Sequence, residues 1–263
     1  MSKPLTLWTA PTPNGSKVSI YLEELKAAYG RDKVDYQVRI LNFYKNEQKE
    51  EWFIKINPNG RIPALTDHSR NDFNVFESGA ILLYLTQYYD TEHKFSFDPV
   101  THPDEYSEQL QWIFFAHGGI GPMQGQANHF FRYAPEKIPY GITRYQNETK
   151  RLYGVLEIRL SSNGGRDYLV GPGKGKYTIA DMNAFGWVRT WRWSGIENLD
   201  FCPNVAAWIK RISDRPAVQA ELLVVPSSHS GKKLTKEEED KIAAENSKWI
   251  MAANQAKAAN QAK

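Results

Sequence analysis

The segment from residue 57 to residue 79 constrains the fold of this chain more than any other part of it. Two short apolar runs flank a polar turn at about residues 67–74, which predicts two strands joined as a hairpin. Pro63 stands at the entry to the first strand, a position that suits a residue without an N–H group or one in a tight cis turn. The second strand ends at Glu77 and Ser78, where the next helix is expected to begin.

This strand-to-helix corner has features of a binding site for an anion. The unpaired N–H groups at the start of a helix attract a carboxylate. Ile62, directly before the proline, keeps both of its backbone groups, and an extended peptide could pair with them by strand addition. The residues alone therefore leave two interpretations open: a plain hairpin followed by a capped helix, or a corner that binds a peptide-like ligand.

The bulk composition excludes several classes of protein. The 263 residues are 41% hydrophobic and 24% charged, which is typical of a globular protein with one large domain or two small ones. A net charge of +3 argues against nucleic acid or an anionic membrane as a partner. With a single cysteine and no apolar signal segment after Met1, we expect a cytoplasmic protein. No apolar run approaches the roughly 18 residues of a membrane span.

The N-terminal part alternates strands and helices. Residues 5–8 and 35–40 are expected strands, and between them the apolar positions 18, 21, 22 and 25 predict an amphipathic helix that ends near Gly30. A short helix is expected at residues 47–55, followed by the two strands of the hairpin and a helix over residues 78–89. The order βαβαββα predicts a thioredoxin-like α/β domain spanning residues 1–92.

Residues 100–226 read as an all-helical domain. A helix expected at residues 105–131 contains Pro122 after three glycines, so a kink or break is predicted there. Further helices are expected at residues 140–162 and 204–213, and a capping box that begins at Thr178 opens another one.

The C-terminal segment, residues 227–263, has a different composition. It is polar and rich in Lys, Glu, Ala, Asn and Gln, so we expect an appendage that is either flexible or docked on the surface. Thr235 and Glu238 could cap a helix that reaches Met251. A docked tail that covers an active-site cleft is a further alternative.

Two groups of residues resemble those of a known family. The motif Arg-Ile-Pro-Ala-Leu at residues 61–65, with Glu77 and Ser78 about 15 residues after its proline, resembles the glutathione site of cytosolic glutathione transferases. The motif Ala-Pro-Thr-Pro-Asn-Gly at residues 10–15 resembles one branch of that family. This branch contains fungal relatives of the yeast nitrogen-catabolite regulator and the bacterial nu-class enzymes. The resemblance covers about residues 4–225 and implies a homodimer.

The resemblance implies roles for the residues nearest the ligand. Asn14 and Thr12 would meet the glutathione sulfur. Ile62, in a cis bond with Pro63, would pair with the cysteinyl backbone of glutathione, and the pair that follows the hairpin, Glu77 and Ser78, would bind its γ-glutamyl end.

Other positions carry weaker implications. Gln48 and Arg61 would contact the glycyl end of glutathione. Arg144 would reach a second glutathione, although it reads equally well as an exposed helix cation. Gln111 would act across a dimer interface. No metal site is expected, because the histidines have no metal-ligand spacing.

The turn before the first helix could ionise a thiol. A cysteinyl thiol has a pKa of about 8.5, and lowering it by two units takes roughly 2.7 kcal/mol. One hydrogen bond to a charged acceptor provides about 1.5–3 kcal/mol, and a helix N-terminus provides about 0.3–1 kcal/mol. The amide of Asn14 and the hydroxyl of Thr12 can be such donors. The alternative is a capped turn that binds no ligand.

The resemblance also implies an activity. The branch is known for weak classical conjugation and for glutathione-dependent disulfide reduction, so we expect reduction to exceed conjugation with a small electrophile, in a role such as detoxification. No cysteine precedes Pro13, so glutathione itself would have to supply the thiolates. Cys202 lies before a helix of the second domain and is expected to be structural or incidental. The alternative function is a non-catalytic protein of the same fold that binds glutathione or apolar ligands as a ligandin or regulator.

Overall fold

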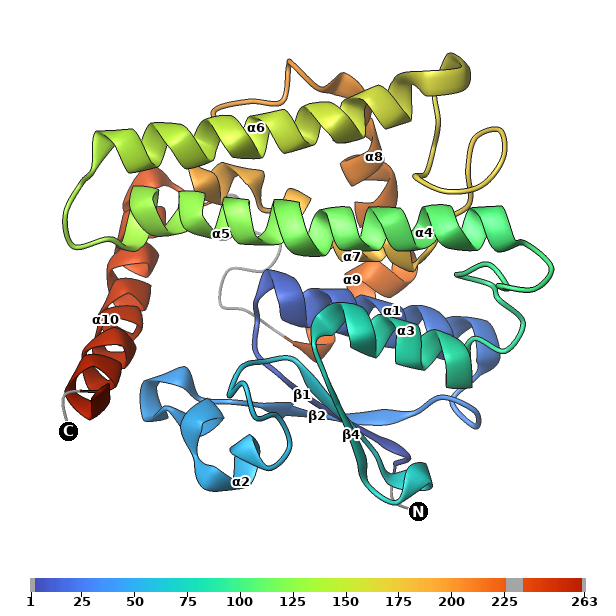
Figure 1. Ribbon diagram of the computed structural model, residues 1–263, viewed down its shortest axis with the longest axis horizontal. Coiled ribbons are helices and arrows are strands. Elements are labelled where there is room, and N and C mark those ends of the chain that lie inside the picture. Colours follow the sequence, from blue (N-terminus) through green and yellow to red (C-terminus); the bar gives the residue numbers. More distant parts are fainter. Residues whose placement is uncertain (1–2, 226–233, 262–263) are drawn as a thin grey trace.

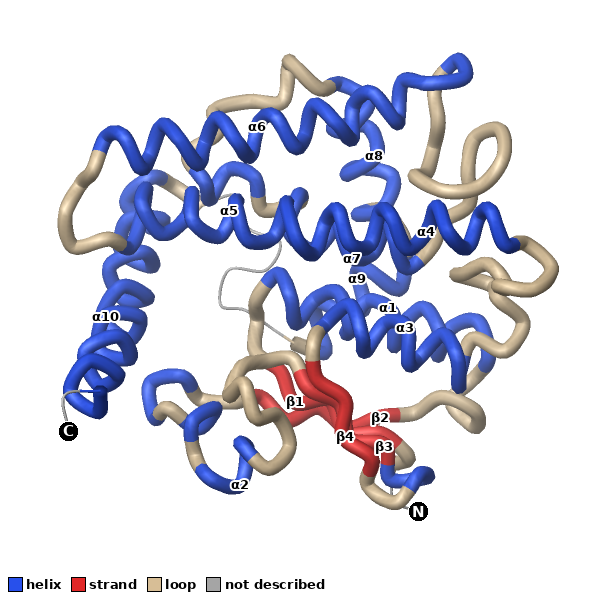
Figure 2. The backbone as a smooth tube through the Cα atoms, viewed as in Figure 1, coloured by secondary structure: helices blue, strands red, loops and turns tan. Residues whose placement is uncertain are grey.

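The structure, a computed structural model, describes residues 3–225 and 234–261 (Figure 1). Its sheet contains β1 (Leu5–Thr9), β2 (Tyr36–Ile40), β3 (Ala64–Asp67) and β4 (Phe73–Phe76) in the spatial order β2-β1-β3-β4. β1 runs parallel to β2 and antiparallel to β3, which in turn runs antiparallel to β4. Two helices, α1 (Pro13–Tyr29) and α3 (Ser78–Tyr89), lie between the sheet and the helical domain (Figure 2). The expected thioredoxin-like α/β domain is confirmed.

Helix α1 differs from the amphipathic helix that the sequence predicted. All residues from Gly15 to Leu25 are buried, including Lys17 and two glutamates. The reason is that α1 packs against α3 and also against α7 (Ile179–Val188) and α9 (Pro216–Val224) of the helical domain. A helix covered on every side cannot show a polar face, so its polar residues need partners inside the protein.

The connection between β2 and β3 also differs from the expectation of one helix over residues 47–55. The chain forms two 3₁₀ turns, η1 (Phe43–Lys45) and η2 (Glu47–Lys49), followed by the short helix α2 (Glu51–Ile54). Glu50 between them has an extended backbone, with φ −70° and ψ 149°, which interrupts the helix. The expectation of a single helix was therefore wrong.

The helical domain begins with a nearly continuous helical rod. It contains α4 (Pro103–Phe115), the π turn η4 (Ala116–Ile120), α5 (Gly121–Asn128) and a second π turn, η5 (His129–Tyr133). The predicted kink at Pro122 takes the form of η4. A π turn changes the register of the backbone hydrogen bonds at the point where proline has no N–H to donate.

The remaining helices of this domain match the sequence more closely. They are α6 (Pro139–Ser161), α7 with the predicted capping box at Thr178, and α8 (Pro203–Ser213). Helix α9 was not predicted, because Pro216 reads as a stop signal after α8. In the structure this proline opens α9 from its first turn, where its missing N–H is not needed.

The C-terminal helix α10 (Lys236–Gln261) docks on the helical domain. The Thr235 backbone N–H donates to Glu238 and the Glu238 N–H donates to Thr235 Oγ1, which confirms the predicted cap. The helix continues past Met251, where the sequence analysis ended it. Arg132 of η5 pairs with Glu239 at 2.7 Å and anchors α10, which extends from there along one side of the molecule in Figure 1. Positions 227–233 and 262–263 of the predicted tail lie outside the described residues.

One apolar core runs through both domains. It includes the β1 residues Leu5 and Leu7, the apolar residues of α1 and α3, and residues of α6 to α9 such as Leu156 and Trp208. Since α1 contributes to both halves of this core, its N-terminal turn is held by the helical domain as well as by the sheet. No helix in the described ranges is both long and apolar enough to cross a membrane.

Candidate functional site

Strand register brings three separate segments of the chain to one edge of the sheet. Trp8 pairs with Ala64, and Ala64 pairs with Phe76. The peptide bond between Ile62 and Pro63 is cis and comes directly before β3. The end of β1, the start of β3 and the end of β4 therefore lie side by side. As a result, the N-termini of α1 and α3 flank the cis peptide bond.

The N-terminal turn of α1 is capped by Thr12. Its Oγ1 accepts a hydrogen bond from the Gly15 N–H at 3.1 Å, so the hydroxyl proton remains available to another acceptor. Gly15 is required by space: a Cβ there would stand 2.4 Å from Thr9 Oγ1 and 2.5 Å from the Ala10 carbonyl. The close approach of this turn to the end of β1 fixes where Thr12 and Asn14 lie.

Asn14 is held by a residue of the other domain. The indole Nε1 of Trp187, on α7, donates to Asn14 Oδ1 at 2.8 Å. Because an indole N–H can only donate, this contact identifies the amide oxygen and leaves the two N–H groups of Asn14 for a different acceptor. The indole itself rests on α5, where a Cβ at Gly121 would lie 2.9 Å from Nε1 and one at Gly125 would lie 3.3 Å from the ring.

On the other side of the cis bond, the backbone next to Arg61 packs against the turn that carries Gln48. A Cβ at Gly60 would lie 2.8 Å from the Gln48 carbonyl, and the carbonyl of Arg61 accepts from Asn57 Nδ2 at 2.6 Å. The Gln48 amide donates to Asn46 at 3.0 Å, and its buried Oε1 has no hydrogen-bond partner among the described residues. The Arg61 side chain is exposed. These two positions can meet a ligand that passes the cis bond.

The corner at the start of α3 combines opposite charges. Glu77 is exposed, has a positive φ of 69°, and its Oε2 lies 3.1 Å from His117 Nε2 of the π turn η4. Ser78 is buried, and its Oγ accepts a 3.5 Å hydrogen bond from Lys17 Nζ. Burial lowers the Lys17 pKa to about 7, against the opposing effect of the Glu77 charge. The site therefore offers a carboxylate, a hydroxyl and helix N–H groups within one turn.

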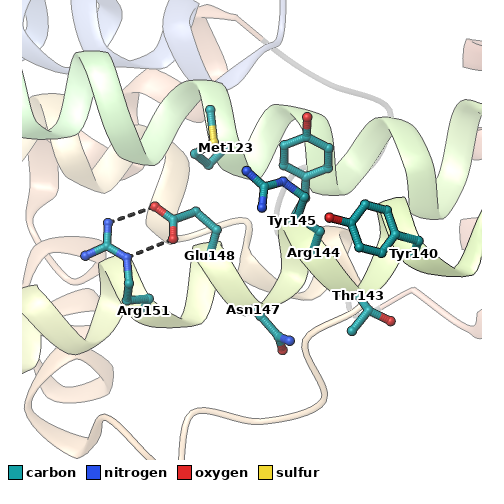
Figure 3. A pocket seen from close by; sticks show the side chains of 8 residues that line it. All are labelled: Met123, Tyr140, Thr143, Arg144, Tyr145, Asn147, Glu148 and Arg151. Atoms are coloured by element: carbon teal, nitrogen blue, oxygen red, sulfur yellow. Dashed lines mark hydrogen bonds and ion pairs between the residues drawn. The ribbon is translucent and has the colours of Figure 1, made fainter.

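Two predicted residues lie away from this corner. Gln111 is exposed on α4, and Arg144 is exposed on α6. Arg144 lines a separate pocket of about 580 Å³ (Figure 3). In it Arg151 donates to both oxygens of Glu148, at 2.8 and 2.7 Å. The other lining residues are Met123, Tyr140, Thr143, Tyr145 and Asn147. No contact recorded for the described residues joins Arg144 or Gln111 to the turn of α1.

Two other kinds of reactive group, a cysteine thiolate and a bound metal ion, find no support among the described residues. The Cys202 thiol is buried, and burial together with the charge of Glu157 raises its pKa to about 12. It is therefore unsuited to act as a thiolate, as the sequence analysis expected. Within the part of the chain that the structure describes, no group of three or more His, Cys, Asp or Glu side chains is arranged to hold a metal ion.

Sequence reasoning missed Trp187, Lys17 and His117. A lysine among the apolar positions of α1 was a visible signal, because a cation placed among core residues needs a reason to be there. The small residues Gly121 and Gly125, four apart on α5, signalled a flat surface on one helix. Nothing in the sequence connected that surface with position 14.

Comparisons with known proteins find one family in both parts of the chain. Residues 3–87 match the family described as "Glutathione S-transferase, N-terminal domain", and residues 134–220 match "Glutathione S-transferase, C-terminal domain". The disulfide-bond oxidoreductase YfcG of Escherichia coli is 41% identical over 83% of this chain and 94% of its own length.

Two solved structures are similar over most of this chain. The glutathione transferase homologue from Lodderomyces elongisporus, solved with two GSH per subunit, is 43% identical with a TM-score of 0.77, over 86% of this chain and 100% of its own. The transferase URE2P8 of Phanerochaete chrysosporium, solved with oxidized glutathione, is 39% identical with a TM-score of 0.74, over 84% of this chain and 94% of its own.

Proposed function

Because this chain belongs to the glutathione S-transferase family, in the branch with the Ure2-type proteins, we propose that it is a glutathione-dependent disulfide oxidoreductase. The observation that carries the proposal is the hydrogen bond from Trp187 to Asn14 Oδ1, which leaves the amide N–H groups free for the sulfur. The substrates are glutathione and a small disulfide, with conjugation to small electrophiles as a weaker activity.

Asn14 and Thr12 stabilise the thiolate in this proposal. Asn14 has two amide protons to donate, and the Thr12 hydroxyl, which already accepts from Gly15, has one. The sulfur would also face the N-terminus of α1, which favours negative charge. Two charge-assisted hydrogen bonds provide about 3 kcal/mol or more, enough to lower the thiol pKa by about two units.

The rest of the glutathione molecule fits the remaining groups of the site. Ile62 pairs with the cysteinyl backbone as an added strand would. Glu77 binds the γ-glutamyl amine, and Ser78 with the N-terminus of α3 binds the γ-glutamyl carboxylate. Gln48, with an unpaired acceptor, and Arg61, with an exposed guanidinium, contact the glycyl end.

The reaction needs two glutathione molecules and no protein cysteine. The first thiolate attacks one sulfur of the disulfide, forms a mixed disulfide, and expels a thiolate that takes up a proton. A second glutathione thiolate then attacks the glutathione sulfur of the mixed disulfide and releases the second thiol. The products are glutathione disulfide and two thiols, so electrons and protons balance. In the proposal Arg144 attracts the second glutathione.

We also assign the chain to the cytoplasm and to a homodimer with Gln111 at the subunit contact. The cytoplasmic assignment is supported by a chemistry that needs reduced glutathione. The dimer is supported by exposed apolar side chains on β4 and α4: Phe73 is 54% exposed, Phe76 39% and Phe114 65%. Sedimentation at several concentrations tests this assembly.

Glutathione-dependent reduction of hydroxyethyl disulfide tests the proposed activity. Asn14→Ala is expected to lower kcat/KM by about tenfold to 100-fold, the effect of one charge-assisted hydrogen bond. Gln87→Ala, which removes an amide from the exposed face of α3, serves as the control and should leave the rate unchanged. Turnover unaffected by Asn14→Ala would contradict the assigned role. Tight glutathione binding without turnover in the wild type would favour the ligandin alternative.

A further inference from the structure

Lys17 is one of the most deeply buried side chains of the protein, although it carries an amine. It is 1% exposed. Its stem packs under α7, where a Cβ at Gly186 would lie 2.8 Å from Lys17 Cγ. Its Nζ reaches Ser78 Oγ at 3.5 Å, also in a buried setting. A long cation is therefore held with its charged end directed at the first residue of α3.

The charges around Lys17 do not neutralise it. The elements packed on α1 bring Glu77 at the N-cap of α3, Arg189 at the C-cap of α7, and Glu221 on α9. His117 of η4 stands beside Glu77. Arg189 and Glu221 pair with each other at 3.3 Å, and Glu77 lies against His117 at 3.1 Å. Among the described residues, no carboxylate oxygen forms an ion pair with Lys17 Nζ within 4 Å. A buried ammonium without a counter-charge is costly, so the site favours an added anion.

The hydrogen bond between Lys17 and Ser78 has a fixed direction when Lys17 is charged. An ammonium group can only donate, so Ser78 Oγ accepts from it. The Ser78 proton must then point to another acceptor. The Lys17 ammonium and the N–H groups at the start of α3 therefore both contribute positive potential at the Ser78 hydroxyl.

We propose that Lys17 is a positioning residue for the γ-glutamyl carboxylate of glutathione, supplying through Ser78 the positive charge that this carboxylate requires. The inference rests on the proposed glutathione site. Glu77 binds the α-amine of the same γ-glutamyl residue, so the corner provides a separate partner for the positive and for the negative charge of that residue. In this proposal Lys17 makes the site prefer a ligand with a free α-carboxylate over one in which that group is missing.

A proton must be taken up when such a ligand binds. Without ligand, burial holds the Lys17 pKa near 7, so at pH 8 most Lys17 side chains are neutral. A carboxylate next to Ser78 favours the charged form and raises the Lys17 pKa. Binding at pH 8 therefore draws about one proton from the buffer, whereas binding at pH 6 draws almost none, because Lys17 is already charged.

Calorimetric titration with S-methylglutathione, which has no ionisable thiol, measures this uptake directly. Titrations at pH 8 in buffers with different enthalpies of protonation should show uptake of about one proton by the wild type. Lys17→Met should take up none and bind about tenfold more weakly. Lys17→Arg, which stays charged, should bind without uptake. Circular dichroism confirms that the variants are folded.

A second ligand separates this role from a structural one. The S-methyl tripeptide analogue that lacks the α-carboxylate should bind wild type and Lys17→Met equally, because its missing group is the one that Lys17 serves. An equal loss for both ligands, or undiminished uptake in Lys17→Met, would overturn the role of Lys17 and leave the glutathione site standing. No binding of S-methylglutathione to the wild type would overturn the proposed function and this inference together.

Discussion

Replacing Trp187 with phenylalanine should raise the pKa of enzyme-bound glutathione without touching the ligand. The substitution keeps an aromatic ring against Gly121 and Gly125 but removes the N–H that holds Asn14 Oδ1 at 2.8 Å. The amide is then free to rotate by half a turn and present its oxygen to the sulfur. An oxygen beside a thiolate repels it, so only the original orientation is productive.

The expected size of this effect follows from the contact that is lost. A neutral hydrogen bond of this kind contributes about 1 kcal/mol, and 1.36 kcal/mol corresponds to one pKa unit. Losing the preference for one amide orientation should therefore raise the thiol pKa by about 0.7 to 1 unit. With glutathione saturating, kcat/KM for the disulfide reports the thiol of the enzyme–glutathione complex, so the acidic limb of its pH profile should move to higher pH by the same amount. With a wild-type thiol pKa about two units below 8.5, the rate falls about twofold to threefold at pH 7 and about fivefold to tenfold at pH 5, and above pH 9 wild type and Trp187→Phe converge.

Trp193→Phe is the matched control for this prediction. It also removes an indole hydrogen bond, the one from Trp193 to Tyr133 Oη, but at a place away from α1. Its pH profile should coincide with that of the wild type. If Trp187→Phe lowered the rate equally at every pH, or left the acidic limb in place, the argument that Trp187 orients Asn14 would be refuted.

Three further predictions concern the stability and packing of the protein. Burial holds the Lys17 pKa near 7 against 10.5 for the free side chain, so the unfolded chain binds more protons between these values and stability rises with pH across that window. Lys17→Met should therefore increase the free energy of unfolding by roughly 3 to 5 kcal/mol at pH 6 and by much less at pH 10. An equal gain at both pH values, measured by urea titration, would contradict this. Gly15→Ala should destabilise the protein by about 2–3 kcal/mol, because its Cβ would overlap the end of β1. The control Gly154→Ala in α6, where the added Cβ meets nothing within 4 Å, should stabilise the protein by about 0.5–1 kcal/mol. Similar shifts of the thermal unfolding midpoint in Gly15→Ala and Gly154→Ala would refute the claim that space requires a glycine at position 15. Arg132→Ala removes the ion pair to Glu239 and should speed proteolysis of α10 while the rest of the chain stays intact, whereas unchanged cleavage would mean that other contacts hold this helix.

Much of the fold could be predicted because local signals agreed with the final structure. The boundaries of α3 and α6 and the cap of α7 follow from turn residues, apolar spacing and capping chemistry, and the structure reproduces them. The errors occurred where tertiary packing dominates. Helix α1 is buried all round because two domains cover it, and α9 was not predicted because the proline that opens it resembles a helix stop signal.

The candidate site was predicted only in part for a related reason. Residues near one another in the sequence, such as Glu77 and Ser78, could be assigned from their place at a helix start. Trp187 acts on Asn14 across 173 positions of the chain, and no pattern of spacing reveals such a pair. Lys17 was visible, but its meaning depends on burial that only the packed structure provides.

The thiolate content of bound glutathione tests the central claim most directly. Ultraviolet titration of the complex against pH should give a thiol pKa about two units below the value of about 8.5 for a free cysteinyl thiol. In Asn14→Ala this pKa should return at least one unit toward the free value. A thiol pKa close to 8.5 in the wild-type complex, or the same depressed pKa in both proteins, would contradict the claim that Asn14 stabilises the thiolate.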